Sequence, residues 1–210
     1  MIFSAFAVAG IANSYNIIDG FNGLAGIVAL IAFIAIALVS TSVGDLELAS
    51  VSWIFVGAIL GFTALNWPYG RIFLGDGGSY LVGFAVGWLS IMLVERNSTV
   101  SPFACLLICI YPITEVVFSI YRRSRGSKDT TSPDRLHLHS LFARRFINRK
   151  FHKLSPIKKN SLTGLSMSLL ALPSGLLVLL VYESTLVCII FCLLFIITYV
   201  LAYRRLVIFR

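Results

Sequence analysis

The stretch LAGIVALIAFIAIALVS, residues 24–40, carries no charged side chain and is apolar almost throughout. Similar apolar runs follow at 49–66, 77–94, 101–121, 161–182 and 184–203. Each run has close to the ~20 residues that a helix needs to cross ~30 Å of hydrocarbon. The sequence therefore predicts an all-α fold, a polytopic bundle of transmembrane helices.

The composition of the whole chain agrees with a membrane setting. Apolar residues make up 58% of the 210 residues, charged residues 12%, and the mean hydropathy is +0.92. A soluble domain of this size needs far more polar surface to cover its core. The opening run, 1–12, is too short to span alone, so six spans are expected, or seven if it continues into the polar stretch that follows. We expect one integral membrane domain over 1–210, with about seven membrane segments.

The basic residues predict the orientation of the bundle. Twelve of the seventeen Lys and Arg lie between Arg122 and Lys159, so the positive-inside rule makes the basic loop 122–160 cytoplasmic. Alternating the spans from this loop leaves only Arg96 on the outer side. The polar segments at 13–23 and 67–76 then open to the cytoplasmic face as well, and a bundle can gather all three into one site.

The first polar segment, NSYNIIDGFNG at 13–23, precedes the run at 24–40. Asn13, Asn16 and Asp19 recur every three residues, so on a helix they share one face. Near lipid such groups must face a protein interior or a water-filled cavity. Asp19-Gly20 is also a good turn dipeptide, and a helix end that unwinds into a turn reconciles both interpretations. A turn does not explain Asn13 and Asn16, so we favour a functional site.

The second polar segment, RIFLGDGGSY at 71–80, places Asp76 just ahead of an apolar run. Ser79 can cap the helix that follows, and the free N–H groups of its first turn favour a phosphate. A carboxylate at the same point can hold Mg²⁺ together with phosphate oxygens. No Lys follows the glycines, which excludes a Walker loop. The alternative is a capped loop without chemistry.

The third polar segment, SPDRLHLHS at 132–140, lies inside the basic loop. His137 and His139 can bind a transition metal, or they can contact phosphate beside Arg135. The alternative is a solvated basic loop attracted to anionic lipid. Glu115, inside the run at 101–121, is either a further site residue or the partner of a basic residue in this segment.

Taken in order, NSYNIIDGFNGLAG (13–26), RIFLGDGGSYLVGF (71–84) and SPDRLHLHSLF (132–142) resemble successive signatures of the polyprenyl-phosphate N-acetylhexosamine-1-phosphate transferases, the glycosyltransferase 4 type. This family includes the phospho-MurNAc-pentapeptide translocase, and the third motif resembles the GlcNAc-type branch. The resemblance implies transfer of a sugar-1-phosphate, an N-acetylhexosamine phosphate, from a UDP-sugar to a membrane polyprenyl phosphate. UMP leaves, and a cell-envelope glycan such as an O-antigen is begun.

The resemblance also implies roles for particular residues. Asp76 falls at the Mg²⁺ ligand and Asp19 at an essential acid, so both are expected metal ligands, with Mn²⁺ as the alternative ion. His137 and His139 join them as the expected catalytic residues. The expected substrate-binding residues are Asn13, Asn16, Asn66, Arg71, Phe73 and Arg135. Phe73 is expected to stack on the uracil.

The setting implied by the resemblance is the bacterial inner (plasma) membrane, with several spans and an active site that faces the cytoplasm. Beyond the two substrates and the membrane, the expected partner is a second copy in a homodimer, and nucleic acid is not expected.

Three features differ from the family pattern. Ser140 stands at the last position of a His-x-His-His motif, Asn22 stands where many members carry a second Asp, and the Asp-Asp motif of an earlier loop is absent. We therefore expect the 210 residues to be the C-terminal part of a larger family fold, inactive alone. The alternative functions are a multi-pass transporter or lipid-binding membrane protein, and a catalytically inactive fragment of the transferase.

Overall fold

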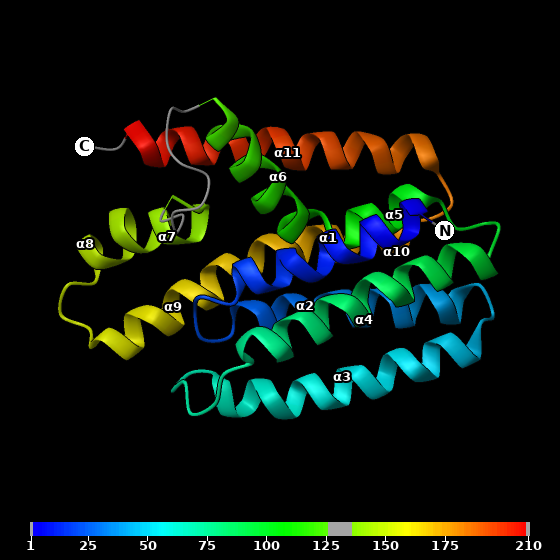
Figure 1. Cartoon of the computed structure of the whole chain (residues 1–210), viewed down its shortest axis with the longest axis horizontal. Helices are drawn as coiled ribbons and strands as arrows, with labels where there is room; N and C mark the ends of the chain where they lie inside the picture. The colour runs from blue at the N-terminus through cyan, green and yellow to red at the C-terminus, as the bar shows by residue number, and fades with distance from the viewer. Residues whose placement is uncertain (1, 126–135, 209–210) are drawn as a thin grey trace.

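The computed structural model describes residues 2–125 and 136–208, and every regular element in these two ranges is a helix (Figure 1). The predicted all-α fold is confirmed. The elements in order are α1 (Ile2–Ile18), α2 (Leu24–Ser42), α3 (Leu46–Asn66), α4 (Gly75–Arg96), α5 (Pro102–Ile108), α6 (Ile110–Ser124), α7 (Leu138–Phe142), the π-helix η1 (Ala143–Ile147), α8 (Asn148–Lys150), α9 (Pro156–Ser168), the 3₁₀ turn η2 (Leu169–Ala171), α10 (Leu172–Val181) and α11 (Thr185–Ile208).

Five helices of the described residues are long and apolar enough to cross a membrane: α2, α3, α4, the continuous stretch Pro156–Val181, and α11. The bent pair α5 and α6 makes a sixth if it counts as one span. The opening helix α1 does extend into the polar stretch, as one interpretation required, but at 17 residues it is shorter than the others. The chain is a multi-pass membrane protein, and the predicted count of seven segments is not confirmed.

The run at 101–121, predicted as one span, is broken into α5 and α6, whose axes differ by 81°. Pro112 lies four residues after Ile108, the last residue of α5. Its ring clashes with the carbonyl four residues earlier and it has no N–H to donate there. The helix therefore ends at Ile108 and restarts in a new direction, which carries Glu115 away from the axis of α5.

Close contact between α1 and α4 is possible because α4 presents glycines to α1. A Cβ atom on Gly83 would lie 2.7 Å from Ala12 Cα, and one on Gly87 would lie 3.3 Å from Val8 Cα. Small residues at this spacing let membrane helices approach closely. Because the two helices run in opposite directions (Figure 1), the end of α1 with Asp19 lies beside the start of α4.

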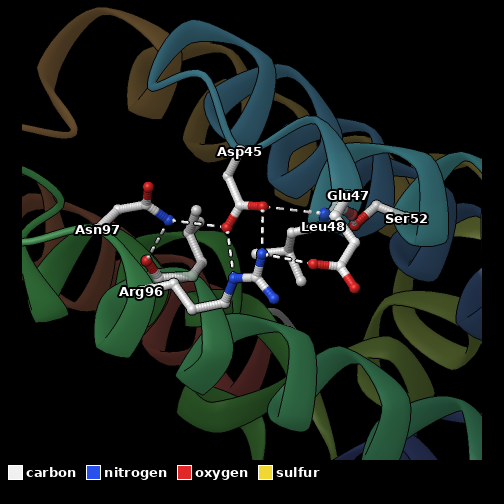
Figure 2. A network of polar contacts seen from close by, with 7 residues as sticks. Asp45, Glu47, Leu48, Ser52, Arg96 and Asn97 are labelled. Atoms are coloured by element: carbon white, nitrogen blue, oxygen red, sulfur yellow. Dashed lines mark hydrogen bonds and ion pairs between the residues drawn. The ribbon is translucent and has the colours of Figure 1, made fainter.

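The far end of the bundle is fixed by an ion-pair network between the α2–α3 loop and the end of α4 (Figure 2). Arg96 donates from Nε and Nη2 to the two oxygens of Asp45, at 2.8 and 2.9 Å, and from Nη2 to Glu47 at 2.8 Å. Asp45 also accepts from the Leu48 N–H at 3.1 Å and so caps α3. Desolvation opposes the ionised Asp45, but these bonds and one from Asn97 outweigh it and lower its pKa.

The opposite end of the bundle gathers the polar segments. The end of α1, the end of α3, the start of α4 and the short helices α7 and α8 all lie toward the left of Figure 1. The predicted loop 122–160 is partly helical, since α6 continues to Ser124 and α9 begins at Pro156. Arg135 lies outside the described residues.

Candidate active site

Asp19 stands at the point where α1 ends and a turn begins. Asn13 and Asn16 are helical, and Asp19 directly follows Ile18, the last residue of the helix. The Asp19 N–H donates to the Asn16 carbonyl at 3.3 Å, and the Gly20 N–H donates to the Ile18 carbonyl at 2.8 Å. The interpretation of this segment as a helix end that unwinds into a turn is confirmed.

Asp76 lies in the first turn of α4, which begins at Gly75. Gly75 has a φ of 62°, a left-handed conformation that glycine adopts without strain. Because the helix starts there, Ser79 lies inside it and cannot be its cap, contrary to the prediction. The buried Ser79 hydroxyl instead donates to the Asp76 carbonyl at 3.1 Å.

Asn16 joins the first two motifs. Its side-chain nitrogen donates to Asp76 Oδ1 at 2.9 Å and to Ser79 Oγ at 3.0 Å. This amide therefore links the exposed Asp76 to α1, one turn before Asp19. Asn13, one turn earlier still, is exposed.

Asp19 and Asp76 form a pair of interacting carboxylates. Burial, and then the negative charge of Asp76, raise the pKa of Asp19 from 3.8 to about 6. A divalent cation would relieve this repulsion, so the donor set fits Mg²⁺ or Mn²⁺. Within 2–125 and 136–208, no group of three or more His, Cys, Asp or Glu is placed to hold a metal. The other ligands of a cation here would be water and substrate phosphate, as is common for Mg²⁺.

The histidine motif is held by Glu115 of α6. Glu115 Oε1 accepts the Leu138 N–H at 2.7 Å and lies 3.3 Å from His137 Nδ1 and 3.6 Å from His139 Nδ1. The two imidazoles are stacked, with centroids 5.2 Å apart and planes within 9°. Of the two interpretations left open for Glu115, the partner of the basic segment is the one that the contacts match.

His139 also contacts the first motif. Its buried ring packs edge-on against Phe21, with centroids 5.6 Å apart. A Cβ atom on Gly20 would lie 4.0 Å from His139 Nε2. The third motif therefore meets the first beside Asp19, and the three segments predicted to share a site do come together.

Asn66 connects two loops of the site rather than facing open space. It is 4% exposed, its Oδ1 accepts the Gly23 N–H at 2.6 Å, and its Nδ2 donates to the Ile72 carbonyl at 2.7 Å. Both polar groups of this side chain are thus engaged by the main chain. Substrate binding by Asn66 stays a prediction. In the structure this side chain holds together the main chain at Gly23 and at Ile72.

Arg71 and Phe73 lie on the loop that Asn66 supports, and both are exposed. The Phe73 side chain is 69% exposed, and the Arg71 guanidinium lies over the Tyr69 ring at 5.6 Å from its centroid. An exposed aromatic ring three residues before Asp76 suits the stacking of a planar base. The predicted contact of Phe73 with uracil remains untested.

Asn22 has a structural role that the sequence did not predict. It is buried, its N–H donates to Asn160 Oδ1 at 2.7 Å, and its Nδ2 donates to Ser161 Oγ at 3.2 Å and the Pro68 carbonyl at 3.4 Å. A carboxylate in its place could not donate these last two bonds. The amide therefore ties the first motif to α9 and to the loop after α3.

The surface beyond the site is positively charged. Over the described residues 143–159 the basic side chains are mostly exposed, and they follow the histidine motif directly. A cluster of like charge attracts ligands of the opposite sign, such as a nucleotide diphosphate.

Residues 1–94 match the model of glycosyl transferase family 4. The undecaprenyl-phosphate alpha-N-acetylglucosaminyl 1-phosphate transferase of Salmonella typhi is 34% identical over 169 residues, which cover 78% of this chain and 46% of that protein. The Escherichia coli (strain K12) transferase of the same name is 32% identical over 144 residues, 66% of this chain and 39% of that protein.

A further relative is the probable undecaprenyl-phosphate N-acetylglucosaminyl 1-phosphate transferase of Bacillus subtilis (strain 168). It is 29% identical over 133 residues, which cover 63% of this chain and 37% of that protein. The chain spans less than half the length of these curated relatives. Together with the three convergent motifs, these similarities show that the chain belongs to glycosyl transferase family 4, the polyprenyl-phosphate N-acetylhexosamine-1-phosphate transferase type.

Proposed function

We propose that this chain carries the catalytic centre of a sugar-1-phosphate transferase. An N-acetylhexosamine phosphate passes from a UDP-sugar to a polyprenyl phosphate. A diphosphate bond to the lipid phosphate forms while the donor diphosphate bond breaks, and UMP leaves. The observation that carries this proposal is the link from Asn16 to Asp76, with His139 beside Gly20, because it joins two carboxylates and two imidazoles at one end of the bundle.

The carboxylates are the proposed metal ligands. Asp19 and Asp76 would hold Mg²⁺, with Mn²⁺ as the alternative, and the ion would stabilise charge on the transferring phosphoryl group. Asn16 holds the Asp76 carboxylate in place through its 2.9 Å bond. Asn66 fixes the loop that presents Phe73, whose exposed ring would stack on the uracil.

The remaining predicted residues would bind the anionic parts of the substrates. His137 and His139 would contact the diphosphate, and the approach of His139 Nε2 to Gly20, the neighbour of Asp19, supports this role. Arg71 is exposed on the donor loop, and Asn13 lies one turn before Asn16. Arg135 is proposed as a phosphate contact from its position in the motif alone.

The protein has an apolar groove that suits the lipid tail of the acceptor. A half-open pocket of about 650 Å³ runs along α1 between α4, α5 and α6. Its lining is strongly apolar and includes Phe6, Ile11, Ile91, Phe103, Val117 and Ile120. Because α1 also ends at Asp19, an acceptor could lay its isoprenoid along this helix and present its phosphate at the carboxylates.

The setting of the reaction is proposed to be the cytoplasmic face of a bacterial inner membrane, and the protein could act as a homodimer. A transporter would place polar groups near the middle of the membrane. Here the polar motifs gather at one end of the bundle, where α1 ends and α4 begins, which favours the transferase.

The test is transfer of radiolabelled sugar phosphate from UDP-GlcNAc to polyprenyl phosphate in detergent with Mg²⁺. Because the chain spans less than half of its relatives, it is assayed alone and co-expressed with the N-terminal segment of a full-length relative. We expect labelled lipid and an equal amount of UMP from the co-expressed form. If nucleotide sugar binds but neither form makes labelled lipid, the proposed function is wrong.

Asp76→Asn is the decisive variant in this assay. Loss of a ligand from a metal–diphosphate site removes several kcal/mol of transition-state stabilisation, so turnover should fall by about 10³-fold or more. Glu183→Gln, in the turn before α11 at the far end of the bundle, is the matched control and should leave turnover unchanged. Near-normal turnover of Asp76→Asn in a correctly inserted protein would exclude the metal assignment.

A further inference from the structure

Glu115 is a carboxylate inside the membrane domain whose side chain has no exposed surface. A buried carboxylate is costly unless other groups satisfy it. We propose that Glu115 is a positioning residue that holds both histidines of the third motif by their Nδ1 atoms and directs their Nε2 atoms to the transfer site. This inference rests on the proposed function for its effect on catalysis, but not for its geometry.

The contacts of Glu115 converge on one oxygen. Oε1 accepts the Leu138 N–H at 2.7 Å, and the Nδ1 atoms of His137 and His139 lie 3.3 and 3.6 Å from the same oxygen. His137 has an extended backbone, with ψ at 150°. The residues on either side of Leu138 can therefore turn toward the same carboxylate, and their rings stack within 9° of parallel. One oxygen thus binds the main chain at Leu138 and faces the Nδ1 atoms of both rings at ion-pair distance.

This arrangement decides which nitrogen of each ring is presented to a ligand. An imidazole that faces a carboxylate through Nδ1 carries its proton there, which leaves Nε2 as the outward atom. His139 Nε2 is 4.0 Å from the place of a Cβ on Gly20, the neighbour of Asp19. The outward atom of His139 therefore lies on the side of the proposed transfer site.

The broken helix explains how the carboxylate reaches the motif. Pro112 ends α5 and redirects α6 by 81°, and α6 then packs against α1. Glu115 lies one turn after Pro112, on the part of α6 that the bend has redirected. A straight helix over 101–121 would continue along α5 instead.

The first experiment measures the tautomers directly and needs no activity. The 210-residue chain, labelled with ¹⁵N-histidine in detergent, is observed at a pH where the imidazoles are neutral. We expect His137 and His139 to carry the proton on Nδ1, and Glu115→Gln to shift both toward the Nε2–H form. His152, exposed after α8, is the internal control and should not change. Nε2–H forms in the unsubstituted chain, or no shift in the variant, would overturn the proposal.

The second experiment measures catalysis in the co-expressed form. Glu115→Gln keeps the side-chain shape but loses the charge, and should lower kcat on the order of 100-fold. The KM for UDP-GlcNAc should change less than about two-fold, because the donor loop is untouched. Glu115→Asp should recover part of kcat, and Glu183→Gln should have no effect. A fall in kcat without a change of tautomer would mean a merely structural role and would overturn the proposal.

The two experiments separate the two claims. If no form transfers sugar phosphate, the proposed function fails, and the ¹⁵N spectra still decide whether Glu115 sets the tautomers. If transfer occurs and Glu115→Gln changes neither kcat nor the spectra, only the inference about Glu115 fails.

Discussion

At Asp19, burial and a neighbouring carboxylate act in the same direction. Both disfavour the ionised form, and the pKa rises to about 6. An acid with this pKa is half protonated at about pH 6 and largely ionised at pH 7. Protons and a metal ion therefore compete for the Asp19 carboxylate, so the affinity of the first motif for the metal should depend on pH.

We predict that Mg²⁺ binding weakens as the pH falls through about 6, because protons then compete for Asp19. Isothermal titration of Mn²⁺ or Mg²⁺ between pH 5 and 8 measures the effect. An affinity independent of pH across this range would contradict the raised pKa.

The same shift has a consequence for stability. The folded chain binds more protons at Asp19 than the unfolded chain between the ordinary pKa, 3.8, and about 6. Without metal, the contribution of Asp19 to the free energy of unfolding is thus present at low pH and is lost as the pH rises through about 6.

Individual residues also show which contacts the sequence predicts and which it does not. The three-residue spacing predicted one helix face for Asn13, Asn16 and Asp19. The structure places Asn13 and Asn16 one turn apart in α1, whereas Asp19 lies just past the end of that helix. The bonds from Asn22 to Asn160 and Ser161 join residues about 140 positions apart. No local pattern encodes such a pairing, because it depends on how α9 packs against the first motif. Ser79 was expected to cap the helix that follows it, but α4 already begins four residues earlier, at Gly75.

At the scale of helices, hydropathy predicted the spans but not their shape. The run at 101–121 is mostly apolar and Glu115 is its one charged residue, so its composition alone indicates one helix. The break comes from Pro112, which lacks an N–H to donate and whose ring clashes with the carbonyl four residues earlier. A hydropathy average does not register these local effects. The close contact of α1 and α4 likewise depends on which face of α4 carries Gly83 and Gly87.

Gly83→Ala should disturb this contact and the site together. The new Cβ would lie 2.7 Å from Ala12 Cα and 2.9 Å from the Ile11 carbonyl oxygen, so the backbone of α1 must move. Overpacking of this kind costs about 1–3 kcal/mol, and the melting temperature in detergent should fall. The link from Asn16 to Asp76 should also loosen and reduce transfer.

Gly61→Ala in α3 is the matched control for this substitution. A Cβ on Gly61 would meet nothing within 4 Å, so stability should be unchanged or slightly increased. Equal melting temperatures for the two variants would show that the contact between α1 and α4 does not depend on Gly83.

At the scale of the whole molecule, the uneven distribution of charge predicted that three distant segments share one end of the bundle. The structure confirms the convergence, because the histidine motif reaches the turn after α1 and Asn16 reaches the start of α4. The side of the membrane that this end faces stays a prediction from the positive-inside rule.

Cysteine labelling in whole cells tests the orientation. Tyr69→Cys and Arg149→Cys, both at exposed positions near the site, should react with a membrane-impermeant reagent only after the cells are opened. Ser98→Cys, at the far end of the bundle, should react in intact cells. The four native cysteines are buried and give a low background. Labelling of all three positions from the same side would disprove the topology.

If the three motifs form one metal-dependent site, bound Mn²⁺ can report on all three at once. Bound Mn²⁺ broadens the NMR signals of nuclei close to it, so the ¹⁵N-histidine spectrum of the chain is recorded as Mn²⁺ is added. A single shared site predicts strong broadening of His139 and His137, little effect on the exposed His152, and loss of the selective broadening in Asp76→Asn. Equal broadening of His139 and His152, or selective broadening that persists in Asp76→Asn, would contradict it.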